Sequence, residues 1–278
     1  MKAGTNAITH FGLVAGRGHY PLMFCREAKR RGVRHLAVVA MHGETEPEIN
    51  ELADRTDWVY VGQLDKTIKT FRRQQVTDVV FAGQVSPRRL FDGLRPDVRT
   101  LKILAALKER NAESIFTSVA DEFGKDGINV LPATTFLERF LAPEGLIGKV
   151  KPGKSECQDV AFGQRIAAEI SRLDIGQTVV VKGGTVLAVE AFEGTDKAIC
   201  RGGELGRGGI VVVKAAKPGH DIRFDVPCIG LRTVETLRAA GAKALAVQAG
   251  VTLFIEMDRV IDELNHANIA VVGYRPEA

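Results

Sequence analysis

Short apolar runs alternate with amphipathic stretches over the first 140 residues of the chain. Continuous apolar runs predict buried strands, and apolar positions three or four residues apart predict helices. The alternation of the two predicts a mostly parallel sheet with helices on its faces. The predicted strands cover residues 10–15, 35–40, 58–61, 79–82 and 128–131. The predicted helices cover residues 22–31, 64–75, 97–110, 114–123 and 135–140.

The pattern changes in the second half of the chain. Two β-branched runs, at residues 178–181 and 185–189, are joined by Lys182-Gly183-Gly184, which predicts a hairpin. The residue before Pro227 disfavours helix, so residues 221–227 are expected to be short and extended. The hairpin and the units after it predict a mixed sheet. Those units are strands at 210–214, 244–249, 252–255 and 269–272, and helices at 159–170, 233–240 and 258–267.

A segment rich in glycine, proline and lysine separates the two patterns. Residues 143–158 contain Lys149, Lys151 and Lys154 among chain-breaking residues, which is typical of a connection between domains. We therefore expect an N-terminal α/β domain over residues 1–142, a linker over 143–158 and a C-terminal mixed-sheet α/β domain over 159–278. The basic loop is either solvated or in contact with a ligand.

The amino-acid composition argues against several classes of protein. Of the 278 residues, 45% are hydrophobic and 26% charged, which argues against a disordered chain. A formal charge of +4 is too small to indicate nucleic-acid binding, and 6% aromatic residues are too few for base-stacking platforms. We therefore expect no nucleic-acid partner. The mild positive charge suits an anionic small molecule or an anionic lipid surface.

The cysteines and the hydropathy pattern indicate the compartment. The four cysteines are far apart and form no C-x-x-C pair, which argues against a disulfide scaffold or a zinc knuckle. No apolar run approaches the ~18–20 residues that span a bilayer, and no signal-peptide core is visible. We expect a cytoplasmic protein that can contact a membrane from its surface.

A glycine turn follows the first predicted strand. Gly16 and Gly18 stand between that strand and a helix, where glycines let the backbone approach a phosphate. Pro21 occupies the place of the third glycine of a dinucleotide fingerprint, which argues against NAD. Either a tight turn or an anion site explains the pattern. Gly83 lies just past another strand, and Arg88 and Arg89 after it either meet a phosphate or are solvated at the start of a helix.

Acidic residues gather in two places in the second half. Glu190, Glu193 and Asp196 end a strand and enter a Gly-Thr turn, so they form either a hard-cation site or an ordinary acidic loop. Asp221 and Asp225 follow lysines at 214 and 217, and an extended segment places both carboxylates on one face. Lysines that neutralise phosphate charge beside carboxylates that hold Mg²⁺ suit phosphoryl or pyrophosphate chemistry.

Other enzyme classes lack support in the sequence. The histidines form no H-x-x-x-H or H-E-x-x-H pattern, so we expect no zinc. A serine hydrolase elbow and a Walker lysine motif are also absent from the sequence.

Five motifs extend over nearly the whole chain: LVAGRGHYP (13–21), FAGQV (81–85), LDIGQTVVV (173–181), VLAVEAFEGTD (186–196) and KPGHDIRFDVPCIG (217–230). On these motifs the chain resembles the LpxI-type UDP-2,3-diacylglucosamine pyrophosphatases of lipid A (lipopolysaccharide) biosynthesis. Arg17, His220 and Cys228 depart from the usual family residues, and the acidic positions are intact.

The resemblance implies hydrolysis of UDP-2,3-diacylglucosamine to UMP and 2,3-diacylglucosamine 1-phosphate (lipid X), with Mg²⁺ or a similar divalent cation. It also implies a Rossmann-like N-terminal domain, a catalytic C-terminal domain and a homodimer in peripheral contact with the cytoplasmic face of the inner membrane. Asp225 is the favoured catalytic residue, with Asp221 beside it. The expected metal ligands are Asp221, Asp225, Glu190, Glu193 and Asp196, and the expected substrate-binding residues are Gly16, Gly18, Gly83, Gly194, Thr195, Lys214 and Lys217.

Two alternatives remain open at this stage. A carrier that binds the lipid or nucleotide sugar without turnover is consistent with the mild positive charge and a diacyl ligand. An NAD-linked enzyme is suggested only by the glycine turn, and the missing third glycine counts against it.

Overall fold

The computed structural model describes residues 9–85, 94–107, 112–217, 219 and 221–276. The chain divides into two compact units. Unit 1 contains Met1–Glu138 together with Asp221–Asp225, and unit 2 contains Arg139–His220 and Val226–Ala278. Unit 1 therefore takes five residues from the middle of the chain segment that otherwise builds unit 2.

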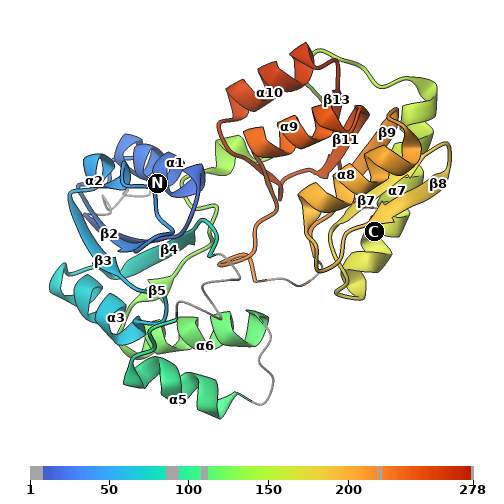
Figure 1. Cartoon of the computed structure of the whole chain (residues 1–278). Coiled ribbons are helices and arrows are strands. Elements are labelled where there is room, and N and C mark those ends of the chain that lie inside the picture. Colours follow the sequence, from blue (N-terminus) through green and yellow to red (C-terminus); the bar gives the residue numbers. More distant parts are fainter. Residues whose placement is uncertain (1–8, 86–93, 108–111, 218, 220, 277–278) are drawn as a thin grey trace, which may run out of the picture. The chain divides into compact units, whose positions relative to one another are not determined.

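Unit 1 is built on a five-stranded, fully parallel sheet in the order β3-β2-β1-β4-β5. Helices α1 and α2 lie on one side of this sheet and α3 on the other (Figure 1). The mostly parallel α/β domain predicted from the sequence is confirmed. The strands are β1 (His10–Ala15), β2 (His35–Met41), β3 (Arg55–Val59), β4 (Asp78–Ala82) and β5 (Asn129–Val130). The helices are α1 (His19–Arg30), α2 (Ile49–Leu52), α3 (Leu64–Arg73), α5 (Val98–Ala106), α6 (Ala112–Lys125) and the 3-10 helix η1 (Glu138–Phe140).

Unit 2 has a six-stranded mixed sheet in the order β6-β13-β11-β9-β7-β8. Strands β13, β11 and β9 are parallel, whereas β6 and β7 run antiparallel to their neighbours. The mixed sheet and the hairpin are confirmed. The strands are β6 (Gly145–Ile147), β7 (Thr178–Lys182), β8 (Thr185–Val189), β9 (Ile210–Lys214), β11 (Ala242–Gln248) and β13 (Ala270–Tyr274), with β10 (Cys228–Ile229) and β12 (Leu253–Phe254) in a separate pair. The helices are α7 (Lys154–Arg172), α8 (Thr195–Gly206), α9 (Leu231–Ala239) and α10 (Met257–His266).

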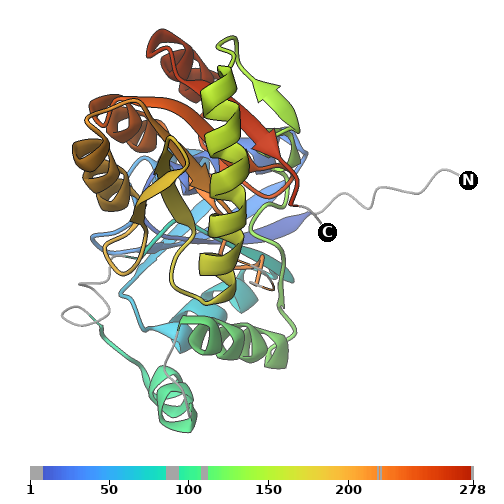
Figure 2. The same ribbon diagram turned by 90° about the vertical axis from the view of Figure 1, so that its right-hand side faces the viewer.

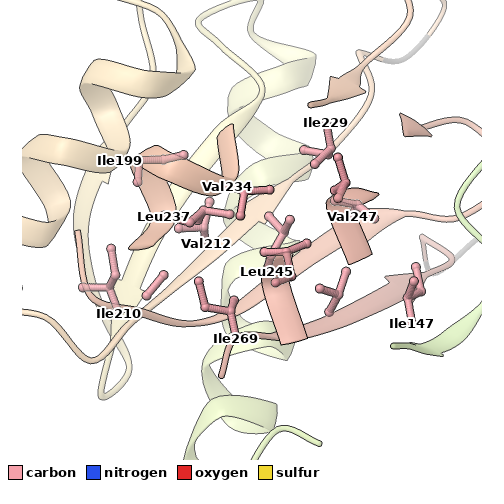
Figure 3. Close-up of a cluster of buried hydrophobic side chains, with 14 of the residues drawn as sticks. Ile147, Ile199, Ile210, Val212, Ile229, Val234, Leu237, Leu245, Val247 and Ile269 are labelled. Carbon is pink, nitrogen blue, oxygen red and sulfur yellow. The ribbon is translucent and has the colours of Figure 1, made fainter. Parts of the chain in front are cut away.

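Along the strands of the unit 2 sheet, side chains point alternately to its two faces and pack into two separate apolar cores. Val212 and Leu245 pack with Ile199 of α8 and Leu237 of α9, as the cluster in Figure 3 shows. Val180 belongs to the same cluster. The residues between them face the long helix α7, which runs along the other side of the sheet (Figure 2). A sheet covered on both faces requires strands without polar positions, which explains the continuous apolar runs in the sequence.

Helix α8 was not predicted from the sequence. It contains Gly202, Gly203 and Gly206, and glycine lowers helix propensity by about 1 kcal/mol relative to alanine. The glycines allow close packing, because a Cβ atom at Gly202 would lie 2.4 Å from Val180 Cγ1, and one at Gly203 would lie 2.7 Å from Ala240 Cβ. Tertiary packing therefore stabilises a helix that local propensity disfavours.

The structure also differs from the expected linker over residues 143–158. Strand β6 pairs antiparallel with β13, and α7 begins at Lys154, so about half of this segment belongs to regular structure of unit 2. Gly145 and Gly148, read from the sequence as breaks, have φ angles of 90° and 89° at the ends of β6. Similarly, the helix predicted at 135–140 is only the 3-10 turn η1.

An ion-pair network joins α5 to the end of α6. Arg99 Nε lies 2.5 Å from Glu122 Oε2, and Arg99 Nη2 lies 2.6 Å from Asp126 Oδ2. The Arg99 side chain is only 21% exposed, so water screens these contacts incompletely. Hydrogen bonding to Arg99 lowers the pKa of Asp126 below its ordinary value.

We expect Arg99→Gln to lower the free energy of unfolding by about 1–3 kcal/mol at neutral pH, because both carboxylates lose a charged donor. A carboxylate whose pKa is lowered by folding stabilises the protein above its unfolded pKa and loses that effect as the pH falls through its folded pKa. The difference between the two proteins should therefore shrink towards about pH 3. Urea unfolding at both pH values measures it, and an equal difference at both would contradict the assignment.

Candidate functional site

The segment around the two aspartates forms a turn. The backbone N–H groups of Phe224 and Asp225 both donate to the carbonyl oxygen of Asp221, at 2.9 and 3.0 Å. The prediction of an extended segment was therefore wrong for residues 221–225. The conformational restriction from Pro227 reaches only Val226, so it does not prevent a turn further upstream.

The turn packs against unit 1. Ala133 N donates to the carbonyl oxygen of Ile222 at 2.9 Å. The Phe224 ring stacks on Phe116 at 5.0 Å and 19°, and it meets Phe81 edge to face at 5.1 Å. The segment that carries the predicted catalytic residues is thus held by a strand end, a helix and a loop of unit 1.

The two aspartates have different surroundings. Arg223 Nε donates to Asp221 Oδ1 at 2.9 Å, Arg223 Nη2 donates to Asp221 Oδ2 at 2.6 Å, and the Arg223 backbone N–H donates to Oδ1 at 3.0 Å. Hydrogen bonding to Asp221 raises the pKa of the Arg223 guanidinium. Asp225 is exposed to solvent. Asp221 therefore holds the turn closed, and Asp225 is the more exposed of the two side chains.

A second group of polar side chains lies at one edge of the sheet in unit 2. Strand β8 runs in the same direction as β9, because both are antiparallel to β7, so their carboxyl ends share this edge. Lys214 Nζ, at the end of β9, lies 3.4 Å from Thr195 Oγ1 and 3.4 Å from the carbonyl oxygen of Cys228. Thr195 Oγ1 donates to Glu190 Oε1 at 2.9 Å.

The start of α8 adds backbone donors to this group. Gly194 is the N-cap residue with a φ angle of 86°, and no atom lies within 4 Å of the position where its Cβ would stand. The first N–H groups of a helix have no intrahelical acceptor and carry partial positive charge. An ammonium, a hydroxyl and a helix N-terminus therefore converge at a carboxyl edge, an arrangement that suits phosphate oxygens.

The predicted metal ligands do not form a preformed cage. Arg201 Nη2 lies 2.7 Å from Glu193 Oε1, and this hydrogen bond lowers the pKa of Glu193. Arg232 Nε lies 2.8 Å from Asp196 Oδ2. Glu190 Oε2 is buried and lacks a hydrogen-bond partner in the part of the chain described.

Three of the predicted metal ligands, Asp221, Glu193 and Asp196, are thus each paired with an arginine. Among the described residues, no group of three or more His, Cys, Asp or Glu side chains could hold a metal ion. The residues present do not fit a metal site built by the protein alone.

The glycines near β1 and β4 have a structural explanation. Arg17 N donates to the carbonyl oxygen of Gln84 at 2.7 Å, which bridges the two strand ends. A Cβ atom at Gly16 would lie 2.7 Å from Gln84 O, and one at Gly83 would lie 2.8 Å from Arg17 O. Close backbone approach therefore requires both glycines. Gly18 has a φ angle of 93°, and no atom lies within 4 Å of the position where its Cβ would stand, so close packing does not explain this glycine.

The remaining predicted residues are placed as follows. Lys217 Nζ pairs with Asp174 Oδ1 at 2.9 Å and is 24% exposed, so an acidic partner already faces this lysine. Arg88, Arg89 and His220 lie outside the described residues.

Sequence reasoning missed Phe81 and Phe116, whose contact with Phe224 depends on chain segments more than 100 residues apart. The only local signal was the apolar Phe224 within a polar motif.

A cavity of about 560 Å³ lies between α6, β5 and the turn, with Arg223 in its wall. Its volume falls within the usual range for ligand cavities. Asp121, Lys125, Asn129 and Arg223 make half of its lining polar, so it does not resemble an apolar tunnel for acyl chains.

Comparison with known proteins covers nearly the whole chain. The family model described as LpxI N-terminal domain matches residues 10–140, and the one described as LpxI C-terminal domain matches residues 143–272. The curated UDP-2,3-diacylglucosamine pyrophosphatase LpxI of Caulobacter vibrioides is 34% identical over an alignment 277 residues long, which covers 96% of this chain and 98% of that protein.

Solved structures offer much weaker likeness. The biotin carboxylase subunit of pyruvate carboxylase has a TM-score of 0.28 and 14% identity, with 65% of this chain and 35% of that one covered. The biotin carboxylase domain of Hydrogenobacter thermophilus 2-oxoglutarate carboxylase has a TM-score of 0.26 and 15% identity, with 63% and 35% covered. This chain spans about a third of each, and neither TM-score indicates a shared fold. In the part of the chain described, no helix is both long and apolar enough to cross a membrane.

Proposed function

Because the chain belongs to the LpxI family, as both domain models and the near-full-length relative show, we propose that it hydrolyses UDP-2,3-diacylglucosamine. The products are UMP and 2,3-diacylglucosamine 1-phosphate. The observation that carries this proposal is the 34% identity to a curated pyrophosphatase across 98% of that protein's length. Fold alone would not support an activity.

The reaction requires water to attack an anionic phosphorus. In the proposed mechanism the Asp225 carboxylate orients a water molecule and accepts its proton as the water oxygen bonds to the UMP-side phosphorus. The bond from that phosphorus to the bridging oxygen breaks, and the bridging oxygen leaves with the sugar phosphate. The exposed position of Asp225 supports this role, and the engagement of Asp221 with Arg223 makes Asp221 its support.

The carboxyl edge of unit 2 supplies positive charge. In this proposal Lys214 and the N–H groups that follow Gly194 bind pyrophosphate oxygens, and Thr195 Oγ1, which donates its proton to Glu190, accepts from Lys214 and helps to hold its ammonium group. Their electrostatic effect is largest where charge accumulates on the phosphoryl oxygens in the transition state.

Mg²⁺ enters this proposal only together with the substrate. Mg²⁺ commonly binds one or two carboxylates plus substrate phosphates, and when bound it neutralises phosphoryl charge. One oxygen of the exposed Asp225 carboxylate would hold it, which leaves the other oxygen to accept the proton of water. We likewise propose a homodimer and peripheral membrane contact. The exposed Lys149, Lys151 and Lys154 suit an anionic lipid surface.

The purified protein, incubated with UDP-2,3-diacylglucosamine in detergent and Mg²⁺, should release UMP, and EDTA should abolish the release. In [¹⁸O]water the label should appear in UMP, because water attacks the UMP-side phosphorus. Label in the sugar phosphate would reverse the assigned direction of attack. Stoichiometric binding without UMP release would refute the hydrolase and support the carrier.

A further inference from the structure

The turn that carries Asp225 is an insertion of unit 2 sequence into unit 1. The strands on either side of it, β9 and β10, belong to unit 2, whereas Asp221–Asp225 belongs to unit 1. We infer that Phe224 is a positioning residue, which fixes the Asp225 carboxylate by anchoring the turn to unit 1. This inference rests on the proposed role of Asp225 in hydrolysis.

The Phe224 ring contacts two elements of unit 1. It stacks on Phe116 of α6 at a centroid distance of 5.0 Å and meets Phe81 of β4 edge to face at 5.1 Å. Phe81 in turn meets Phe123 edge to face at 5.5 Å, and Phe123 is fully buried. Aromatic pairs prefer these geometries, so the turn is connected through Phe81 to the core of unit 1.

Two further contacts restrict the turn to one conformation. The hydrogen bond from Ala133 N to the carbonyl oxygen of Ile222 attaches its backbone, and the Asp221–Arg223 pair closes it from within. Asp121 of α6 adds electrostatic attraction to Arg223. Asp225 follows Phe224 directly, so the anchored ring determines where the next backbone unit and its carboxylate lie.

The rate that a catalytic carboxylate supports depends on its position relative to the reacting atoms. A misplacement of about 1 Å can cost on the order of 10²-fold in rate even when the altered residue does not touch the substrate. Removal of the Phe224 ring leaves Asp225 and the groups of unit 2 chemically intact. The loss should therefore fall on kcat rather than on KM.

We expect Phe224→Ala to lower kcat by roughly 10- to 100-fold, with KM changed by less than about threefold. Phe224→Tyr keeps the stacking ring and should restore kcat to within about threefold of the unaltered protein. Phe116→Ala removes the stacking partner from the other side and should lower kcat by roughly three- to tenfold. The control is Leu205→Ala, an apolar residue 62% exposed at the far end of α8, which should leave kcat unchanged.

A double variant separates positioning from general destabilisation. If Phe224 acts through Asp225, Asp225→Ala combined with Phe224→Ala should lose no more rate than Asp225→Ala alone. Multiplied losses, or unchanged kcat in Phe224→Ala, would overturn the inference. Should Phe224→Ala fail to fold, Phe116→Ala decides the question, because its ring is 39% exposed. Absence of UMP release by the unaltered protein would instead refute the proposed function.

Discussion

Asp225→Ala is expected to lower the rate of UMP release by about 10²-fold or more, because it removes the carboxylate that orients and deprotonates water. Asp225 is exposed and forms part of a surface turn, so its truncation should leave the fold and the melting temperature nearly unchanged. Initial rates of UMP release at saturating substrate measure the effect, and circular dichroism establishes that the variant is folded.

Matched variants make this result specific. Asp262→Ala removes another exposed aspartate, on α10, and should retain full activity. Asp225→Asn keeps the size of the side chain but not its charge, so it should be nearly as slow as Asp225→Ala. Full activity in Asp225→Asn would mean that the negative charge is not required, and the assignment of Asp225 as a base would fail.

Phe123→Ala is expected to lower the free energy of unfolding by about 3–5 kcal/mol, the usual cost of removing a fully buried phenylalanine ring. Phe123 is 0% exposed, and its ring meets Phe71 at 6.2 Å and Phe81 at 5.5 Å. Urea unfolding followed by circular dichroism gives the difference.

The matched control for the buried ring is Phe116→Ala. Its ring is 39% exposed and its removal should cost less than about 1 kcal/mol, although it loosens the turn at Phe224. A loss of stability in Phe123→Ala no larger than in Phe116→Ala would contradict the description of the core. Since Phe81 connects Phe123 to Phe224, Phe123→Ala should also lower kcat.

Most strands could be predicted because their signal is local. Residues 10–15, 178–181 and 210–214 are continuous apolar runs, and each is buried on both faces of its sheet. The hairpin between β7 and β8 was equally clear, since both glycines of its turn have positive φ angles. Helix α8 escaped prediction, because its glycines fit only against Val180 and Ala240, which local propensity does not describe.

The candidate site was also only partly predictable from the sequence. The motifs around Glu190 and Asp225 supplied the residues proposed for the chemistry, but the backbone conformation expected for residues 221–225 was wrong. An extended segment was expected where the carbonyl of Asp221 accepts two backbone hydrogen bonds and closes a turn. Arginines 201 and 232, which engage Glu193 and Asp196, lie at other positions in the chain, so the predicted set of metal ligands did not anticipate them.

The sequence by itself determined the family, the two α/β patterns and the residue types available for pyrophosphate chemistry, because motifs and apolar periodicity are properties of neighbouring residues. Only the tertiary structure decided that Asp221–Asp225 belongs to unit 1, with Phe224 between Phe81 and Phe116. Contacts between residues more than 100 positions apart depend on how sheets and helices bring chain segments together. No local pattern in the sequence encodes that arrangement.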